Sequence, residues 1–429
     1  MTSLAPVSGP AVATVAALLL AALSPAPAAA APSTGDERAR IRLVLVPSDD
    51  DASVDVSGFS FGLIADRVRS VAGLQFGLVF LDATRSLTGL QLSLGFNFVD
   101  GQLRGGQLAG LANFSTVTRG WQVGIGMNRT DNLEGFQGGF ANSADDGRGL
   151  QVGILNGALR FLGGRIGVVN GSEEFEGAEV GLLNFGGSLK GFQVGLMNLP
   201  CLPLASDCAN LHRDISGASV GAVNVAHAMS GFDLALLNVA AEGRGLHVGL
   251  VNLIWNDEGE SLALVSLTRT GIHELALYAT DTMLLNADLK LGSRHLFTVI
   301  TGSLQPGHVP PADSKQIPSD TRRIAIGLGL GWRFPIDWRR LTFLELQLTV
   351  NRLRGDSADL LHDGPSFYTL RLTGAVRLTD HLSLLAGVGL GLTTSATTDQ
   401  PSLGHLATSW QQSDTAFRLF PGVILGLQL

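Results

Sequence analysis

The sequence has few charged residues, few aromatic residues and almost no cysteine. Of its 429 residues, 15% are charged, 6% are aromatic and two are cysteines, and the formal net charge is −8. A nucleic-acid-binding surface requires clustered Lys and Arg, so this composition argues against nucleic acid as a partner. Beyond residue 31 the chain also lacks an apolar run of about 20 residues, so no transmembrane helix is predicted.

The sequence also offers little catalytic chemistry. Its nine histidines are scattered, with no His-x-x-x-His or His-Glu-x-x-His pairing. The glycine-rich runs 327–331 and 387–391 continue as alternating strands instead of preceding a helix, as a dinucleotide loop would. His381 follows Asp380, and His405 lies near Ser402 and Ser409, but turn or loop roles are favoured over a hydrolase site. We therefore predict no enzyme activity and no catalytic, cofactor-binding or metal site.

Glycine, by contrast, is abundant, and much of it belongs to a tandem repeat. The repeat has the form Gly-x-x-apolar-Gly-apolar-x-Asn, as in Gly191–Asn198 (GFQVGLMN). From Asn128 to Asn198 every step is 14 residues, the next is 26, and two steps of 14 follow. A fixed short period indicates one structural unit that is copied and stacked. The asparagines that close the repeats are Asn113, Asn128, Asn142, Asn156, Asn170, Asn184, Asn198, Asn224, Asn238 and Asn252.

Apolar and polar residues alternate within the repeat, which indicates a strand. Phe192, Val194 and Leu196 fall on one parity, and Gln193 and Gly195 fall on the other. The residues between motifs, such as 142–148, are rich in Gly, Asp, Ser and Asn, which favour turns. Each repeat is therefore predicted to be one strand plus one tight turn. The asparagines are interpreted as turn residues at strand ends, in preference to a ligand-binding ladder.

After Asn252 the motif ends, but alternating segments continue. The connections 304–323, 353–366 and 395–415 are long and polar, which is typical of the outside loops of outer-membrane barrels. The last strand is apolar at every second position up to Leu429, and this resembles the terminal strand by which such barrels are recognised for assembly. The predicted strands are 261–268, 273–280, 284–292, 295–303, 324–334, 341–352, 367–378, 381–393 and 416–429.

Two all-β architectures fit this pattern. The favoured one is an antiparallel meander that closes as an outer-membrane-type β-barrel of about 22 strands, because the stride of the repeat continues into the later hairpins. In that barrel the apolar residues Phe192, Val194 and Leu196 and their equivalents face lipid, while Gln193, Gly195 and their equivalents face the interior. The alternative is a β-solenoid, with Val and Leu inside and an Asn ladder, followed by a smaller C-terminal barrel.

The predicted organisation begins with a secretory signal peptide at residues 1–31, because an apolar run is followed by small residues that suit cleavage. Residues 32–57 are a linker or first strand. The repeat region covers 58–266, with an insertion at 199–214, and the C-terminal barrel strands cover 267–429.

The only two cysteines, Cys201 and Cys208, both lie in the insertion. In an oxidising compartment a small disulfide loop is favoured over free thiols. A metal site with Asp207 and His212 is less favoured, because two thiols and one histidine lack the paired spacing of a zinc site.

The blocks Gly149–Asn156 (GLQVGILN), Gly177–Asn184 (GAEVGLLN) and Gly191–Asn198 resemble those of a family of bacterial surface repeat-containing proteins. The resemblance extends from about Gly58 to the C-terminus. It implies an exported protein of the cell surface or outer membrane and implies no activity.

We therefore predict a non-enzymatic outer-membrane protein with a role in structure, surface display or passive permeation. Its expected partners are outer-membrane lipid and the barrel-assembly machinery. The alternative function is that of a surface or periplasmic β-solenoid adhesin or scaffold.

Overall fold

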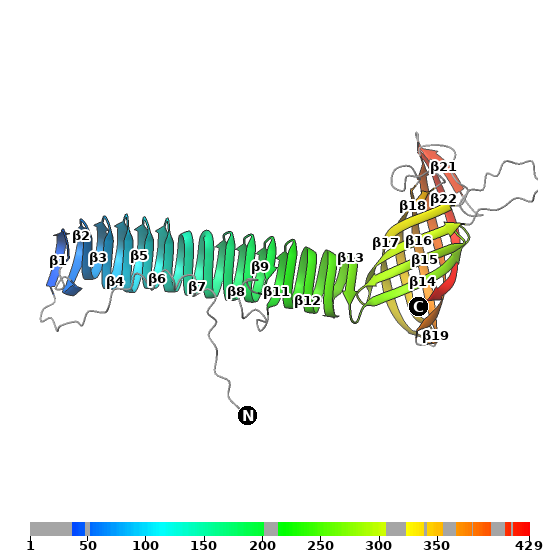
Figure 1. Ribbon diagram of the computed structural model, residues 1–429, viewed down its shortest axis with the longest axis horizontal. Coiled ribbons are helices and arrows are strands. Elements are labelled where there is room, and N and C mark those ends of the chain that lie inside the picture. Colours follow the sequence, from blue (N-terminus) through cyan, green and yellow to red (C-terminus); the bar gives the residue numbers. More distant parts are fainter. Residues whose placement is uncertain are drawn as a thin grey trace, which may run out of the picture. The chain divides into compact units, whose positions relative to one another are not determined.

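The computed structural model is all-β and describes residues 37–47, 52–200, 213–305, 323–338, 341–354, 366–379, 381–395, 408–412 and 415–429. The chain divides into two compact units, Met1–Gly231 and Phe232–Leu429. The first unit consists of coils of a β-solenoid. The second contains the last solenoid coils and an eight-stranded β-barrel (Figure 1).

The solenoid has about 14 turns, and its strands pair in parallel between neighbouring coils. Successive repeats pair at equivalent positions, so that Asn156 lies beside Asn170 and Gly163 beside Gly177. The solenoid strands are β1 (Glu37–Val44), β2 (Val54–Gly62), β3 (Ala65–Gly77), β4 (Phe80–Ser93), β5 (Phe96–Ala109), β6 (Ala112–Gly124), β7 (Met127–Ile166), β8 (Val169–Val180), β9 (Leu183–Val194), β10 (Met197–Leu199), β11 (Asp214–Val220), β12 (Val223–Asp257) and β13 (Glu260–Thr268).

The antiparallel meander predicted for the repeats is therefore wrong, and the solenoid alternative describes them. Alternation fixes which side chains share a face, but it is the same for parallel and antiparallel partners. The tight turns predicted between motifs are also wrong. Residues 142–148 are extended and belong to the long strand β7, so each repeat is a complete coil.

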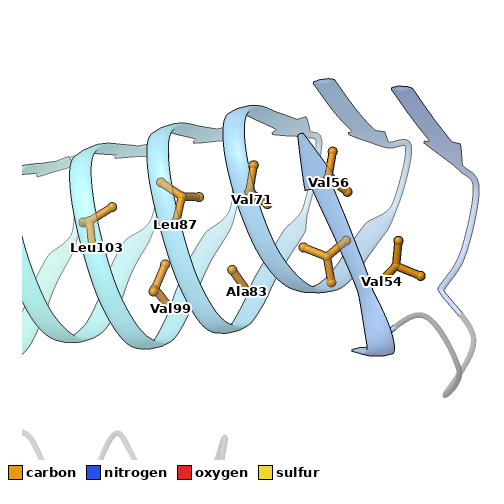
Figure 2. Packing of buried hydrophobic residues seen from close by; sticks show 8 residues of the cluster. Val54, Val56, Val71, Ala83, Leu87, Val99 and Leu103 are labelled. Carbon is orange, nitrogen blue, oxygen red and sulfur yellow. The ribbon is translucent and has the colours of Figure 1, made fainter. Parts of the chain in front are cut away.

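Each coil has two sides, which we define by sequence. The motif side runs from the first glycine of the repeat towards its asparagine, and the linking side joins that asparagine to the next motif. Inward-pointing residues of the linking side form the apolar core, with Val71, Leu87 and Leu103 stacked in successive coils (Figure 2). Full burial of each such side chain contributes about 1.5–3 kcal/mol.

Close packing between coils explains the two glycines of the motif. Gly149 has a φ of +131°, and a Cβ there would lie 1.9 Å from the carbonyl oxygen of Gly135 in the preceding coil. The second glycine makes room for side chains inside the coil. A Cβ on Gly181 would lie 2.6 Å from Nδ2 of Asn170 and 2.8 Å from Oδ1 of Asn184. The first position thus requires glycine, whereas the second also accepts a small residue, as at Ser93, Ala109 and Ala235.

The barrel is closed and antiparallel. Neighbouring strands pair in chain order, and β14 pairs with β22 to complete the ring, while the short strand β21 pairs with β22. Its strands are β14 (Ile272–Thr280), β15 (Leu285–Gly292), β16 (Leu296–Gln305), β17 (Arg323–Trp338), β18 (Leu341–Arg354), β19 (Ser366–Thr379), β20 (Leu382–Ser395), β21 (Thr408–Gln412) and β22 (Thr415–Gln428).

The eight later strands predicted from residue 273 onwards correspond to the eight strands of the ring. The segment predicted at 261–268 is instead β13, which pairs in parallel with β12 as a solenoid coil. Within the second unit, Glu260 of β13 accepts a hydrogen bond from the backbone NH of Leu296 at 3.0 Å. The predicted signal peptide, both cysteines and most of the three predicted long loops lie outside the described residues.

Candidate functional site

The repeat asparagines form a continuous hydrogen-bonded ladder inside the solenoid. In the first unit, Nδ2 of each asparagine from Asn97 to Asn198 donates to Oδ1 of the next one, over 2.7–2.9 Å. The second Nδ2 proton is also used, as in the 2.9 Å bond from Asn156 to the carbonyl of Ile166. In the second unit Asn238 donates to Asn252 over 2.9 Å.

These asparagines are buried, with at most 3% of each residue exposed. Several of them, such as Asn113, Asn170 and Asn184, are the second residue of a strand, so they lie at strand ends. Their side chains bond inside the coil instead of capping a turn, and no ligand reaches them from solvent. The ladder is the one that the solenoid alternative anticipated.

A second ladder of glutamines lies beside the first. Nε2 of Gln91, Gln107, Gln122, Gln137 and Gln151 each donates to Oε1 of the preceding glutamine over 2.7–2.9 Å. The glutamine ladder donates towards the N-terminus and the asparagine ladder towards the C-terminus. Gln193, which the predicted 22-strand barrel would have turned towards its lumen, is instead fully buried inside a solenoid coil.

The glutamine column continues as a buried ion pair. Arg165 and Glu179 occupy the next two positions, and Nη2 of Arg165 lies 2.8 Å from Oε2 of Glu179. Arg165 also lies over the ring of Phe175, 4.4 Å from its centroid. Burial lowers the pKa of Arg165, and the charge of Glu179 opposes that shift.

In the second unit the same column holds Asp233, His247 and Ser261. Nδ1 of His247 lies 2.9 Å from Oδ2 of Asp233. Ser261 lies in the coil after His247, at the position that pairs with it in the parallel strand register. The three residue types match those of a hydrolytic triad. All three are almost fully buried, and the Ser261 hydroxyl is bonded to Asn252 and Ser266. The arrangement has no access for a substrate and continues the polar column.

A hydrolase-like Gly-x-Ser-x-Gly pattern at Gly58–Gly62 is also structural. Ser60 is fully buried and donates a 2.6 Å hydrogen bond to Oδ2 of Asp66. His381 is described, but Asp380, Ser402 and His405 lie outside the described residues. No group of three or more His, Cys, Asp or Glu residues placed to hold a metal occurs in the part of the chain that the structure describes.

The outer surface of the motif side is apolar, and we call it the apolar face. In the ten coils whose first glycines run from Gly73 to Gly217, the first, third and fifth residues after that glycine are all Gly, Ala, Val, Leu, Ile, Phe or Trp. Ile125 is 81% exposed and Leu196 is 54% exposed. Other exposed members include Phe76, Leu78, Leu90, Leu94, Leu108, Phe140, Leu150, Ile154, Ile166, Val168, Val180, Leu182 and Phe192.

The outer surface of the linking side is charged, and many of its charges pair between neighbouring coils. Nε of Arg119 lies 3.1 Å from Oε2 of Glu134, and Nε of Arg160 lies 2.5 Å from Oδ1 of Asp146. The hydrogen bond from Arg160 lowers the pKa of Asp146. A hollow of about 510 Å³ opens on this side around Arg160 and Glu174.

The polarity of the barrel strands is the reverse of that of a soluble protein. In β18, Glu345, Gln347 and Thr349 are buried in the barrel interior, whereas Leu346 and Leu348 alternate with them on the outside. Further outward residues include Leu275, Leu277, Leu289, Ile326, Leu328, Leu330, Val350, Leu370, Leu372, Val388, Leu390, Val423, Leu425 and Leu427.

Ion pairs share the barrel interior with two buried apolar clusters, one around Phe343 and Leu385 and one around Phe367 and Phe420. Lys290 contacts Glu345 and lies 2.8 Å from Oε1 of Gln428. Arg333 bonds to both Glu345 and Glu274 over 2.9 Å. In the same interior, Arg371 lies 3.0 Å from Asp288. These charges come from strands on different parts of the ring and pair across its interior.

Comparisons of the chain with known protein families, characterised proteins and solved structures found no match. No helix in the described residues is long and apolar enough to cross a membrane.

Proposed function

We propose that this protein is a non-enzymatic surface scaffold or adhesin of a bacterium with two membranes. In this proposal the barrel is the outer-membrane anchor, and the solenoid is the part that is displayed. The observation that carries the proposal is the reversed polarity of the barrel, with leucines outside and ion pairs inside.

The outer surface of the barrel supports membrane insertion. Monomeric soluble proteins rarely expose apolar patches larger than a few hundred Å², whereas outward Leu, Ile and Val residues occur around this ring. The ring strands contain 8 to 16 residues, and a tilted strand crosses a bilayer with about 9–11. Closure of the ring leaves no unpaired strand edge, which hydrocarbon would not tolerate.

The barrel interior favours anchoring over permeation. Ion pairs that involve Lys290, Arg333, Arg371 and Glu345 occupy the space between the strands. An eight-stranded ring has room for little more than its own inward side chains. Export through a signal peptide at residues 1–31 and recognition of β22 by the assembly machinery remain parts of the proposal.

The solenoid supports a scaffold role. Its coils repeat the same internal bonds, and its linking side presents a row of charged side chains over many coils. Stacked repeats create extended surfaces that suit binding to large partners. The burial of Asp233, His247 and Ser261, the one group of described residues with triad-like chemistry noted above, supports a role without catalysis.

Fractionation of cells that express the full chain tests the proposal. The protein should sediment with outer membranes, resist extraction by alkaline carbonate, and migrate faster on a denaturing gel when unheated, as folded barrels do. Recovery in the soluble fraction would overturn the anchor.

Two matched variants sharpen this test. Leu348→Arg places a charge on the outside of the barrel, where it should reduce the carbonate-resistant fraction. Leu159→Arg places the same charge at an exposed leucine on the linking side of the solenoid and should leave that fraction unchanged. Equal effects of both variants would contradict the assignment of the barrel as the anchor.

A further inference from the structure

The apolar face of the first unit is too large to be left in water. Ten coils stacked about 4.8 Å apart, with three outward residues spaced about 6.6 Å apart along each, give a face on the order of 700–900 Å². The largest apolar patch of a typical soluble monomer is about 300–600 Å². Something other than water therefore covers this face.

Most polar groups beneath the face are already satisfied from inside. Each inward asparagine from Asn113 to Asn198 bonds to its neighbour, and Gln91 to Gln151 do the same. The backbone of each motif is paired in parallel with the coils on either side. Among the buried side-chain polar atoms of the motif side in these coils, Ser93 Oγ, Asn97 Oδ1, Gln151 Oε1 and Arg165 Nε lack a partner, and the others are bonded inside the coil. The motif side therefore comes close to the condition that hydrocarbon imposes on a protein surface.

The smooth shape of the apolar face suits contact with lipid acyl chains better than packing against a second protein sheet. A Cβ on Gly106 would lie 2.2 Å from the ring of Trp121, and one on Gly138 would lie 2.9 Å from the ring of Phe136. The Cδ1 atom of Leu150 lies in the same way over Gly164. Large side chains thus lie over the neighbouring glycines and smooth the face. Two packed sheets interlock through side chains that interdigitate, whereas acyl chains adapt to a smooth surface.

The distribution of charged side chains also favours a lipid cover for the apolar face. The outward motif positions defined above carry no charged side chain over ten coils, whereas the linking side carries Arg119, Glu134, Asp146 and Arg160. The solenoid is therefore amphipathic across its two sides. Amphipathic helices with such a separation lie in a membrane interface with their apolar side against the acyl chains, and the solenoid has the same separation of apolar and charged sides.

We propose that the apolar face of the solenoid lies against the acyl-chain region of a lipid bilayer and leaves the charged linking side exposed. This inference rests on the proposed membrane anchor, because the barrel is what brings the chain to a bilayer. It identifies the lipid surface as the partner of the motif side and the linking side as the displayed surface.

Spin labels on the full chain test the inference. In a background with Cys201→Ser and Cys208→Ser, single labels are introduced by Ile125→Cys and Leu196→Cys on the apolar face. Glu134→Cys on the linking side and Leu348→Cys on the barrel supply matched references. The protein is inserted into phosphatidylethanolamine–phosphatidylglycerol vesicles, and collisions of each label with oxygen and with a water-soluble nickel complex are measured.

The expected result is that both labels on the apolar face match the label at position 348, with oxygen access above nickel access, and that the order reverses at position 134. If nickel reaches positions 125 and 196 freely while position 348 remains lipid-like, the inference fails and the anchor stands. Exclusion of both reagents with dipolar broadening would show that a second copy covers the face. A water-exposed label at position 348 would refute the anchor itself.

A second measurement keeps both cysteines. Brominated acyl chains quench tryptophan within contact distance, so the wild type and Trp121→Phe are compared in brominated and ordinary vesicles. The quenched component should be smaller in Trp121→Phe by the contribution of one tryptophan. Equal quenching of the two proteins would overturn the proposal.

Discussion

Replacing Asn170 by leucine tests whether the asparagine ladder is a chain of mutually dependent hydrogen bonds. Leucine has nearly the same size but neither donates nor accepts. Its presence would leave one Nδ2 proton of Asn156 without an acceptor, while the other stays bonded to Ile166, and would leave Oδ1 of Asn184 without its donor. The carbonyl of Val180, the third partner, still accepts from the backbone NH of Gly167 at 3.0 Å. Two buried polar atoms are therefore stranded.

Each stranded atom costs about 1–3 kcal/mol, and the apolar side chain offsets part of this, so Asn170→Leu should destabilise its coil by about 3 kcal/mol. Hydrogen exchange of the full chain, followed by mass spectrometry, measures this locally. Amide protection over residues 150–190 should fall about a hundredfold. The N-terminal end of the ladder provides a control. Oδ1 of Asn97 accepts no hydrogen bond, so Asn97→Leu should cost roughly half as much.

Double substitutions separate a ladder from a set of independent contacts. The pair Asn156→Leu with Asn170→Leu strands only two atoms, on Asn142 and Asn184, which is the same number as the single variant. Replacing Asn128 together with Asn170 strands four. Adjacent substitutions should therefore cost about as much as one, and separated substitutions about twice as much. Additive costs for the adjacent pair would refute the reasoning.

Three further predictions concern charge. Burial, followed by repulsion from Asp100, raises the pKa of Asp82 to about 6, so stability from this group is greatest below about pH 4 and is lost as pH rises through 6. Asp82→Asn should remove this pH dependence and stabilise the coil at pH 7.5 by about 2 kcal/mol. Hydrogen exchange of the wild type and the variant at about pH 4 and at pH 7.5 measures both effects. Arg165→Gln should cost about 3–5 kcal/mol because it strands buried Glu179, whereas the double variant with Glu179→Gln should recover most of that loss in urea unfolding by extending the glutamine ladder. Leu348→Arg should destabilise the vesicle-inserted barrel by about 2–4 kcal/mol in urea titrations, and an unchanged midpoint would argue against lipid contact there.

The C-terminal strands were predictable because a barrel is built from local hairpins. Apolar alternation and short connections, such as the one between Gly292 and Leu296, identify neighbours that pair directly. The closing contact between β14 and β22 joins residues far apart in sequence. In the sequence, only the apolar alternation that continues to Leu429 indicated that the last strand closes the barrel.

The repeat region shows where sequence reasoning stops. Alternation put Gln193 and Phe192 on opposite faces, and in the structure Gln193 is buried and Phe192 is exposed. Which face points inward depended on the architecture, since the solenoid alternative placed Val and Leu inside. It did not separate hairpins from coils, because a 14-residue step is long enough for either. Glycine, aspartate and serine between the motifs suggested turns, but they lie on an extended, charged side of the coil.

The polar columns were missed for a different reason. Asp233, His247 and Ser261 each stand two residues after a glycine that occupies the first motif position, where most other coils have glutamine. A comparison of equivalent positions at 14-residue spacing would have aligned them. Their burial, which excludes catalysis, follows only from the closed coil.

The ladder tolerates repeats of unequal length. Asn97 and Asn113 are 16 residues apart, Asn113 and Asn128 are 15 apart, and Asn128 and Asn142 are 14 apart, yet the bonds measure 2.9, 2.8 and 2.8 Å. Even across 26 residues, Asn198 and Asn224 are joined at 2.7 Å. Insertions and deletions between the motifs therefore leave the asparagine ladder intact. Natural selection can diversify the charged side, coil by coil, and can lengthen or shorten the array through duplication, without redesigning its interior.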